Sequence, residues 1–90
     1  MEQHHVLQLF FPQLSYGSVG TYVLIAQDDL NSLGYPTGGL DGVFGSVTQN
    51  STKEYQRKVG LKADGIIGCN TWKSLQESVL GIGRTSSTID

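Results

Sequence analysis

Apolar residues between positions 19 and 33 recur at the spacing of one helix face. They are separated by four, three, four and three positions: Val19, Val23, Ala26, Leu30 and Leu33. This spacing aligns them along a single stripe of an α-helix. Ser18 precedes the stripe, where its hydroxyl is expected to cap the first turn, and Gly34 follows it, where a left-handed residue commonly ends a helix. The pattern therefore predicts a helix over residues 19–33.

Two further helices are predicted, each beginning at a threonine. The second is expected to start with Thr48 as its N-cap and to stop at Gly60, and it runs through Ser51, Thr52, Tyr55 and Val59. The third is expected to start at Thr71 and to end at Gly81, with one stripe formed by Trp72, Leu75 and Val79. Three helices in a chain of this size indicate an all-α fold, a small three-helix bundle.

The segments before the second and third helices repeat one another. Residues 41–48 and 64–71 both read Asp-Gly-apolar-apolar-Gly-x-x-Thr. In each copy the first glycine suits a turn with positive φ, and the aspartate can bond the backbone amides just ahead. The second glycine, Gly45 or Gly68, is expected to let the chain reverse without a Cβ clash. We therefore interpret the two pseudo-repeated Asp-Gly loops first of all as scaffold.

Length and charge narrow the function classes. Ninety residues form one domain with a modest core, and a formal net charge of −2 gives no reason to expect nucleic acid or an anionic membrane as a partner. No apolar run approaches the roughly 20 residues that cross a bilayer. We divide the chain into an N-terminal extension (1–13), a folded domain (14–80) and a linker or disordered tail (81–90). A neutral, polar ligand fits this composition best.

In order along the chain, these motifs closely resemble the peptidoglycan-binding domain, a non-catalytic module of bacterial and phage cell-wall hydrolases. The resemblance runs from about Leu14 to Leu75. It rests on Gln27-x-x-Leu30-Asn31-x-Leu33-Gly34-Tyr35, Leu40-Asp41-Gly42-x-Phe44-Gly45-x-x-Thr48 and Tyr55-Gln56-x-x-x-Gly60-Leu61-x-x-Asp64-Gly65-Ile66-x-Gly68-x-x-Thr71-Trp72. It implies a three-helix fold that tethers an attached amidase, peptidase or muramidase to peptidoglycan, so that the chain itself binds and does not cleave.

The sequence departs from the family pattern in the core of the bundle. Ala26 stands where a larger aliphatic residue is usual, and Ser51 and Thr52 stand where Ala-Val is usual. These changes are expected to soften the core beside the second helix. A buried threonine hydroxyl is tolerable there if it bonds back to a carbonyl one turn earlier.

The resemblance also implies a place of action at the cell wall, outside the cytoplasm. The apolar run 6–11 is short, follows no basic stretch and lacks a small-residue cleavage signal, so it does not resemble a signal peptide. We therefore expect a fragment of a longer protein or a phage lytic protein released by another route. The expected partners are peptidoglycan or a muropeptide and an attached catalytic domain, with the chain itself a monomer.

Candidate catalytic and metal-binding groups are few. His4 and His5 are adjacent and lack the spacing of a zinc site, and no cofactor is expected. Cys69 has no histidine nearby in the sequence to act as its base, so we interpret it as a small buried filler. Asp41 and Asp64 belong to two repeated turns, which argues against a glycosidase pair. No catalytic residue and no metal ligand is predicted.

The predicted ligand-binding residues supply an aromatic platform with amide and amino groups. The set comprises Tyr35, Phe44, Gln49, Asn50 and Lys53. They come from the end of the first helix, the first Asp-Gly loop and the exposed face of the second helix, which short connections hold near one another. Phe44 is expected to be at least partly core. Tyr16 and Tyr22 form a second candidate.

Two questions stay open at this level. Tyr22, Leu24 and Ile25 lie off the apolar stripe and would be covered either by residues 6–11 or by a docked domain or second copy of the chain. An inhibitory prodomain of a secreted metalloproteinase is the rival function, because that fold is similar. Such prodomains carry their cysteine after the last helix, whereas Cys69 precedes it, and this favours the peptidoglycan-binding interpretation.

Overall fold

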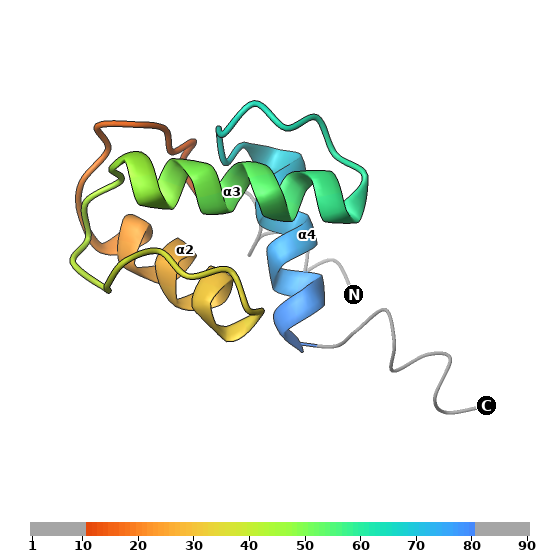
Figure 1. Ribbon diagram of the computed structural model, residues 1–90, viewed down its shortest axis with the longest axis horizontal. Helices are drawn as coiled ribbons and strands as arrows, with labels where there is room; N and C mark the ends of the chain where they lie inside the picture. Colours follow the sequence, from red (N-terminus) through yellow and green to blue (C-terminus); the bar gives the residue numbers. More distant parts are fainter. Residues whose placement is uncertain (1–10, 81–90) are drawn as a thin grey trace.

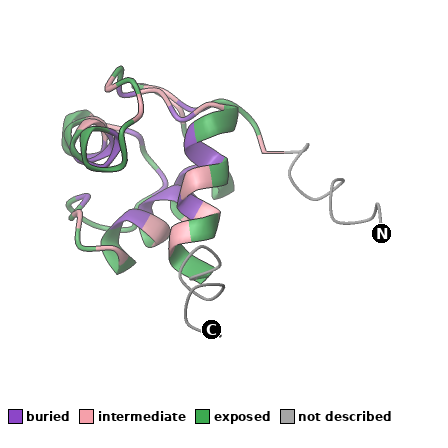
Figure 2. Ribbon diagram, turned by 90° about the vertical axis from the view of Figure 1, so that its right-hand side faces the viewer, coloured by how far each residue is buried: buried purple, intermediate pink, exposed green. Residues whose placement is uncertain are grey.

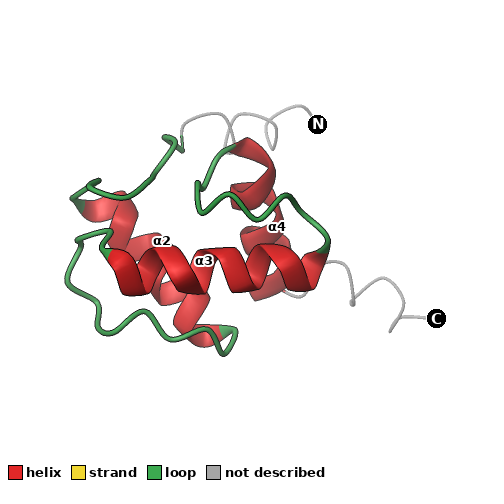
Figure 3. Ribbon diagram, turned by 45° about the horizontal axis from the view of Figure 1, so that its top comes forward, coloured by secondary structure: helices red, strands yellow, loops and turns green. Residues whose placement is uncertain are grey.

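Three α-helices make up the regular structure of the part of the chain that the computed structural model describes, residues 11–80 (Figure 1). They are α2 (Thr21–Ser32), α3 (Ser46–Val59) and α4 (Cys69–Leu80). Between them the chain runs in loops with two isolated antiparallel bridges, and residues 11–80 contain no strand (Figure 3). The predicted all-α class is therefore confirmed.

The core lies where α2 packs against both α3 and α4 (Figure 1). The buried faces of the helices point inward, as Figure 2 shows. The buried hydrophobic residues come from all three helices and from the segments between them: Leu14, Val23, Ala26, Leu30, Phe44, Tyr55, Ile67, Trp72 and Leu75. Three of the nine lie outside helices, so loop residues complete the core of this small domain.

The first helix starts later than its apolar spacing predicts. It begins at Thr21, after Gly20, and no side chain caps it. The Ser18 hydroxyl instead accepts from the Ser15 amide at 3.0 Å, so it closes the preceding turn. Val19 is 71% exposed and pairs with Val43 in an antiparallel bridge. Ser18 as N-cap and Val19 as a core residue were therefore wrong predictions.

The second and third helices start earlier than predicted, because glycine takes the first capping position. The carbonyls of Gly45 and Gly68 accept the first helical hydrogen bonds, from Gln49 and Trp72, at 2.9 Å each. Both glycines lie outside the positive-φ region, and a Cβ at either would meet no closer neighbour than 3.9 Å. Neither glycine is thus needed to reverse the chain, contrary to our prediction. At the position immediately before a helix, the backbone needs only to be extended.

Consequently Thr48 and Thr71 are the third residues of α3 and α4, and neither is an N-cap. Their hydroxyls are buried and bind elsewhere, as described below. The ends of the predicted apolar stripes also differ from expectation. Val59 and Val79 are 40% and 41% exposed, because the last turn of each helix extends beyond the core.

The ends of the first two helices are as predicted. Gly34 and Gly60 have φ values of 96° and 84°, in the left-handed region. Beyond them the chain folds back in a Schellman-type closure, in which Tyr35 N–H donates to Leu30 O and Leu61 N–H donates to Gln56 O, at 2.8 Å each. The glycine stops read from the sequence are confirmed.

Residues 11–20 tie both Asp-Gly loops to the helices. Leu14 exchanges two backbone hydrogen bonds with Ile67 of the second loop, at 3.0 and 2.8 Å. A few residues later Gly20 N–H donates to Gly42 O of the first loop at 2.9 Å. Phe11 packs edge-on against Trp72, with ring centroids 4.6 Å apart, although we had placed position 11 in the extension. The domain boundaries remain a prediction, and residues 81–90 lie outside the described range.

Candidate functional site

Each Asp-Gly loop is fastened to the preceding helix by one buried glutamine. The two N–H groups on Nε2 of Gln27 in α2 are shared among three acceptors, Asp41 Oδ1 (3.1 Å), Val43 O (3.0 Å) and Thr48 Oγ1 (3.1 Å). Its Oε1 accepts from the amide of Gly42 at 3.0 Å. One fully buried side chain thereby joins the aspartate, the turn glycine and the first turn of α3.

Gln56 of α3 repeats this arrangement at the second loop. The two N–H groups on its Nε2 are shared among Asp64 Oδ1 (3.2 Å), Ile66 O (2.9 Å) and Thr71 Oγ1 (3.1 Å), and its Oε1 accepts from Gly65 N–H at 2.9 Å. The loop closes eight residues after its glutamine, whereas the first closes fourteen residues after Gln27. The pseudo-repeat thus includes the glutamines and is independent of the length of the intervening connection.

Both loop aspartates are ionised. The amides of Val43 and Ile66 donate to Oδ1 of Asp41 and Asp64, at 3.0 and 2.9 Å. These backbone hydrogen bonds are the main cause that lowers the pKa of each carboxyl, and the glutamine amides add to it. Lys62 lowers the pKa of Asp64 further through its charge. The predicted Asp-Gly turns, with positive φ at Gly42 and Gly65, are confirmed.

The two loops differ in what covers them. A Cβ placed on Gly42 would lie 3.3 Å from the Gly20 carbonyl and 3.4 Å from Leu24 Cγ, so backbone and an aliphatic side chain cover the first loop. A Cβ placed on Gly65 would lie 3.0 Å from Gln49 Cγ and 3.2 Å from Lys53 Cε. Polar side chains of α3 therefore cover the second loop, and this distinguishes the two copies.

A hollow lies beside each loop, at repeat-related residues. The first has a volume of about 190 Å³ and is lined by Thr37, Gly38, Asp41, Val43, Gly45, Ser46, Val47 and Thr48. The second has a volume of about 320 Å³ and is lined by Gln13, Leu61, Lys62, Asp64, Ile66, Gly68, Cys69, Asn70 and Thr71. Only the second is lined by a lysine and by side-chain amides, so the two hollows have different chemistry.

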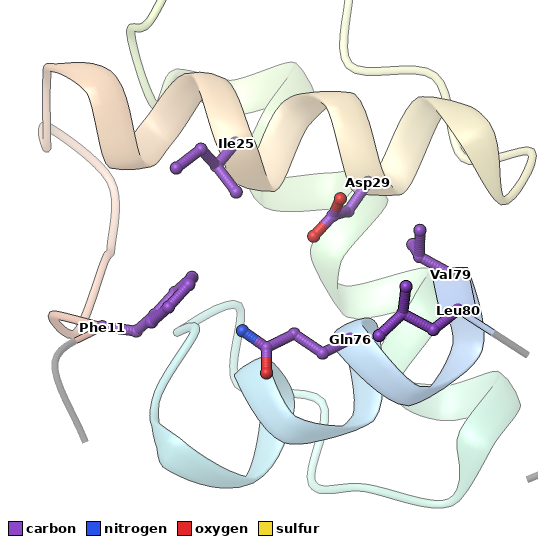
Figure 4. Close-up of a pocket in the computed structure, with 6 residues that line it drawn as sticks. All are labelled: Phe11, Ile25, Asp29, Gln76, Val79 and Leu80. Carbon is purple, nitrogen blue, oxygen red and sulfur yellow. The ribbon is translucent and has the colours of Figure 1, made fainter. Parts of the chain in front are cut away.

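A third cavity, of about 420 Å³, lies between α2 and α4 (Figure 4). Ile25 and Asp29 enter it from α2, Phe11 from the N-terminal segment, and Gln76, Val79 and Leu80 from α4. Burial raises the pKa of Asp29 to about 6, and the neighbouring charge of Asp28 adds to this. The walls are largely apolar, which suits packing of another hydrophobic surface better than recognition of a sugar or a peptide.

The structure separates the five predicted ligand-binding residues. Phe44 is fully buried in the core, so its ring offers no platform to a ligand. Tyr35 is half-buried and packs edge-on against Tyr55, with centroids 5.5 Å apart. Gln49 and Lys53 approach the second loop at Gly65, whereas we expected the patch at the first loop.

Asn50 is exposed on α3, between the positions that approach the second loop. The second candidate pair is also divided. Tyr22 packs edge-on against Phe11, with centroids 5.6 Å apart, while Tyr16 is 63% exposed. Leu24, which we had placed in an outward apolar spot, lies against the first loop as described above. Residues 6–10, one proposed cover for that spot, lie outside the described range.

The candidate reactive groups do not form a site among residues 11–80. Cys69 is exposed at the start of α4, so the prediction of a buried filler was wrong. In this range no three His, Cys, Asp or Glu side chains are grouped to hold a metal ion. His4 and His5 lie outside the described residues. The helices of this range are too short and too polar to cross a membrane.

Sequence comparison assigns the chain to a protein family. Residues 19–75 match the family model described as a putative peptidoglycan binding domain, so the chain belongs to that family. Among curated relatives, it is 48% identical over 56 residues to the N-acetylmuramoyl-L-alanine amidase CwlM of Mycobacterium tuberculosis. The match covers 62% of this chain and 14% of the amidase. The chain thus corresponds to a small part of that relative.

Solved structures agree with this assignment. A peptidoglycan-binding protein from Clostridioides difficile, solved with glutamine hydroxamate, superposes with a TM-score of 0.74 at 42% identity, over 77% of this chain and 43% of that one. The N-terminal domain of SleB gives the same TM-score at 33% identity, over 77% of this chain and 94% of that one. The three-helix domain is therefore a unit that is also found by itself in a solved structure.

Proposed function

We propose that this chain binds bacterial peptidoglycan without cleaving it and anchors an attached cell-wall hydrolase, an amidase, peptidase or muramidase, to its substrate at the cell wall. The family match over residues 19–75 is the observation that carries this proposal. The identified relatives include an amidase much longer than the matched region. A module of this kind raises the local concentration of an attached enzyme at its substrate.

The chemistry of the described residues supports binding over catalysis. The buried polar groups with the most hydrogen bonds, Gln27 and Gln56, are engaged in holding the two loops. Asp41 and Asp64 each accept two hydrogen bonds from their own repeat, which occupies them as turn residues. A binding module needs a rigid framework of this kind more than it needs a titratable acid or base.

We propose that the ligand contacts the exposed side of α3 next to the second loop, through Gln49, Asn50 and Lys53, with Tyr35 as a more distant contact. The side chains of Gln49 and Lys53 approach Gly65 of the second loop, and the neighbours of Gly65 in the sequence, Asp64 and Ile66, line the larger loop hollow. Amide, amine and carboxylate groups there can bond the N-acetyl and peptide groups of a muropeptide. Phe44 is excluded from this set because it is buried.

The anchoring function is tested by co-sedimentation with purified sacculi. The chain is expected to pellet with sacculi in a saturable manner and to be displaced by solubilised muropeptides. Retention no greater than that of a heat-denatured control would contradict the proposal. Incubation of the same sacculi with the chain alone should release no soluble fragments, whereas measurable release would show an enzymatic activity.

A further inference from the structure

The second loop hollow, lined by residues that include Gln13, Lys62, Asp64 and Asn70, combines both signs of charge with amide groups. Its volume of about 320 Å³ reaches the lower end of the range of about 300–1,000 Å³ that is usual for small-ligand sites, whereas the first hollow, at about 190 Å³, does not. The repeat therefore supplies two hollows. Only the second is large enough and suitably charged to hold a small ligand.

Asp64 lines this hollow, and one oxygen of its carboxylate receives no hydrogen bond from residues 11–80. Among residues 11–80, both hydrogen bonds that reach the carboxylate, from Gln56 and from Ile66, end on Oδ1. Oδ2 thus remains for a ligand, and the loop holds the ionised group in place. An ammonium group is the natural donor to such an acceptor, because hydrogen bonds between charged partners are about twice as strong as neutral ones.

Lys62 provides the complementary group two residues earlier in the chain. It is exposed, lines the same hollow, and is close enough for its charge to act on Asp64. The first hollow, which shares the repeat-related loop positions with the second, is lined by no lysine or arginine. A ligand that carries an ammonium and a carboxylate on one carbon offers one charged group to each of these two side chains, which line the same hollow.

We propose that the second hollow binds the zwitterionic end group of a peptidoglycan stem peptide, a free α-amino carboxylate of the meso-diaminopimelate type. Asp64 accepts from its ammonium group and Lys62 donates to its carboxylate, while Gln13 and Asn70 bond the adjoining chain. This inference rests on the peptidoglycan-binding function proposed above. The proposed site recognises one defined part of the wall polymer. It distinguishes stem peptides that carry a free diaminopimelate carboxylate from those in which this group is amidated.

The probe is the synthetic tripeptide L-alanyl-γ-D-glutamyl-meso-diaminopimelate, titrated into the isotope-labelled full chain and followed by amide chemical shifts. Shifts are expected at the residues that line the second hollow. The stem with an amidated diaminopimelate carboxyl and the stem with L-lysine at that position each lack the second charge, so each should bind about tenfold more weakly. Equal affinity for all three stems would overturn the proposal.

The repeat provides a matched pair of variants. Asp64→Asn and Asp41→Asn remove the same charge from the same kind of turn and keep an oxygen that can accept from the backbone amide and the glutamine. Only Asp64→Asn is expected to weaken tripeptide binding, by about tenfold. Lys62→Gln should act similarly, whereas Lys58→Gln, which removes an exposed charge outside the hollow, should not. An equal loss for the aspartate pair, or no loss for Asp64→Asn and Lys62→Gln, would refute the assignment.

Sacculus binding by the same samples separates this inference from the proposed function. If the chain pellets with sacculi but the tripeptide shifts none of the residues of the second hollow, the zwitterion site is wrong and the anchoring function stands. If the folded chain does not bind sacculi, both fail. The amide spectrum of every variant reports its folding directly, so an unfolded variant is recognised before its affinity is interpreted.

Discussion

At the scale of single residues, two buried glutamines determine how the loops are held. Each places its amide nitrogen against three oxygens, those of an aspartate, a backbone carbonyl and a threonine. No buried side-chain nitrogen or oxygen within residues 11–80 lacks a hydrogen-bond partner. A network that is complete in this way stabilises one conformation, because the loss of any member leaves others buried and unpaired.

Gln27→Glu is expected to destabilise the fold by about 2–4 kcal/mol, although it changes almost no volume. The new carboxylate would replace a donor with an acceptor and would face the oxygens of Asp41, Val43 and Thr48. Chemical denaturation at pH 7 measures this change. Asn50→Asp, an exposed amide on α3 for which no side-chain hydrogen bond occurs within residues 11–80, is the charge-matched control and should cost much less. A similar loss for both variants would contradict the network interpretation.

The loop aspartates give the stability a pH dependence with a defined sign. Their folded-state pKa values lie below the unfolded value of about 3.9, so their contribution is present above that value and is lost as the pH falls through the folded-state pKa. In the double variant Asp41→Asn/Asp64→Asn, the fall of stability below pH 4 should be shallower than in the wild type. Denaturation midpoints measured between pH 2 and pH 5 test this, and parallel curves would contradict it.

Asp29 gives the stability a pH dependence of the opposite sign. Because its folded-state pKa is raised to about 6, the unfolded chain ionises first and stability falls as the pH rises from about 4 to about 6. Asp29→Asn removes this penalty. We expect it to stabilise the chain at pH 7 by about 1 kcal/mol, a value discounted for the partial exposure of the group, and to have little effect at pH 4. A gain of equal size at both pH values would rule out titration of Asp29 as the cause.

At the scale of elements, sequence patterns predicted the ends of helices better than their starts. Gly34 and Gly60 ended α2 and α3 as expected, because a left-handed glycine has a local cause that is visible in the sequence. The starts depended on tertiary contacts. Thr48 and Thr71 stand at positions that resemble N-caps, but glycine can cap a helix without a side chain. Each threonine hydroxyl instead accepts a hydrogen bond from a glutamine that is distant in the sequence.

The substitutions in α3 that depart from the family pattern have local solutions. Thr52 is fully buried and donates through Oγ1 to Thr48 O at 2.8 Å, as the sequence argument required. The Ser51 hydroxyl donates to the carbonyl of Pro36. Both hydroxyls are thereby satisfied by backbone oxygens. The effect of these residues on the strength of the core stays a prediction.

The N-terminal segment is expected to stabilise the domain although it precedes the family match at residue 19. Trp72 Nε1 donates to Pro12 O at 2.7 Å, and Phe11 packs edge-on against the Trp72 and Tyr22 rings. Phe11→Ala should therefore cost about 2 kcal/mol, which combines lost burial and two aromatic contacts. Thermal unfolding of this variant beside Tyr16→Ala, an exposed ring of similar size, measures it, and equal melting temperatures would contradict the packing role.

At the scale of the whole molecule, the fold and the family followed from the sequence, whereas the ligand site stays a prediction whose residues the structure does not bring together as expected. Phe44 belongs to a motif whose spacing says nothing about burial, and the structure places it in the core. The position of Gln49 and Lys53 at the second loop depends on how α3 crosses the chain, which no local pattern encodes. The structure shows that the surroundings of the two repeats differ, and no sequence pattern indicated this difference.

Residues 11–80 form a frame in which we propose that the surroundings of the second loop bind the ligand. The two loops are alike in their internal hydrogen bonds and unlike in their surroundings. The first is covered by Leu24, and the second is bordered by polar side chains of α3 and a charged hollow. We therefore expect sacculus binding to depend on Lys53 and Asn50 of the second-loop side and not on Val47, an exposed residue that lines the first hollow.

Co-sedimentation with purified sacculi is the most direct measurement of this function. The full chain should bind saturably, Asn50→Ala/Lys53→Ala should bind at least about tenfold more weakly, and Val47→Ala should bind as the wild type does. Loss of binding confined to the second-loop variant is the predicted result. Wild-type retention at the level of the denatured control would contradict peptidoglycan binding, and undiminished retention of Asn50→Ala/Lys53→Ala would contradict its placement beside the second loop.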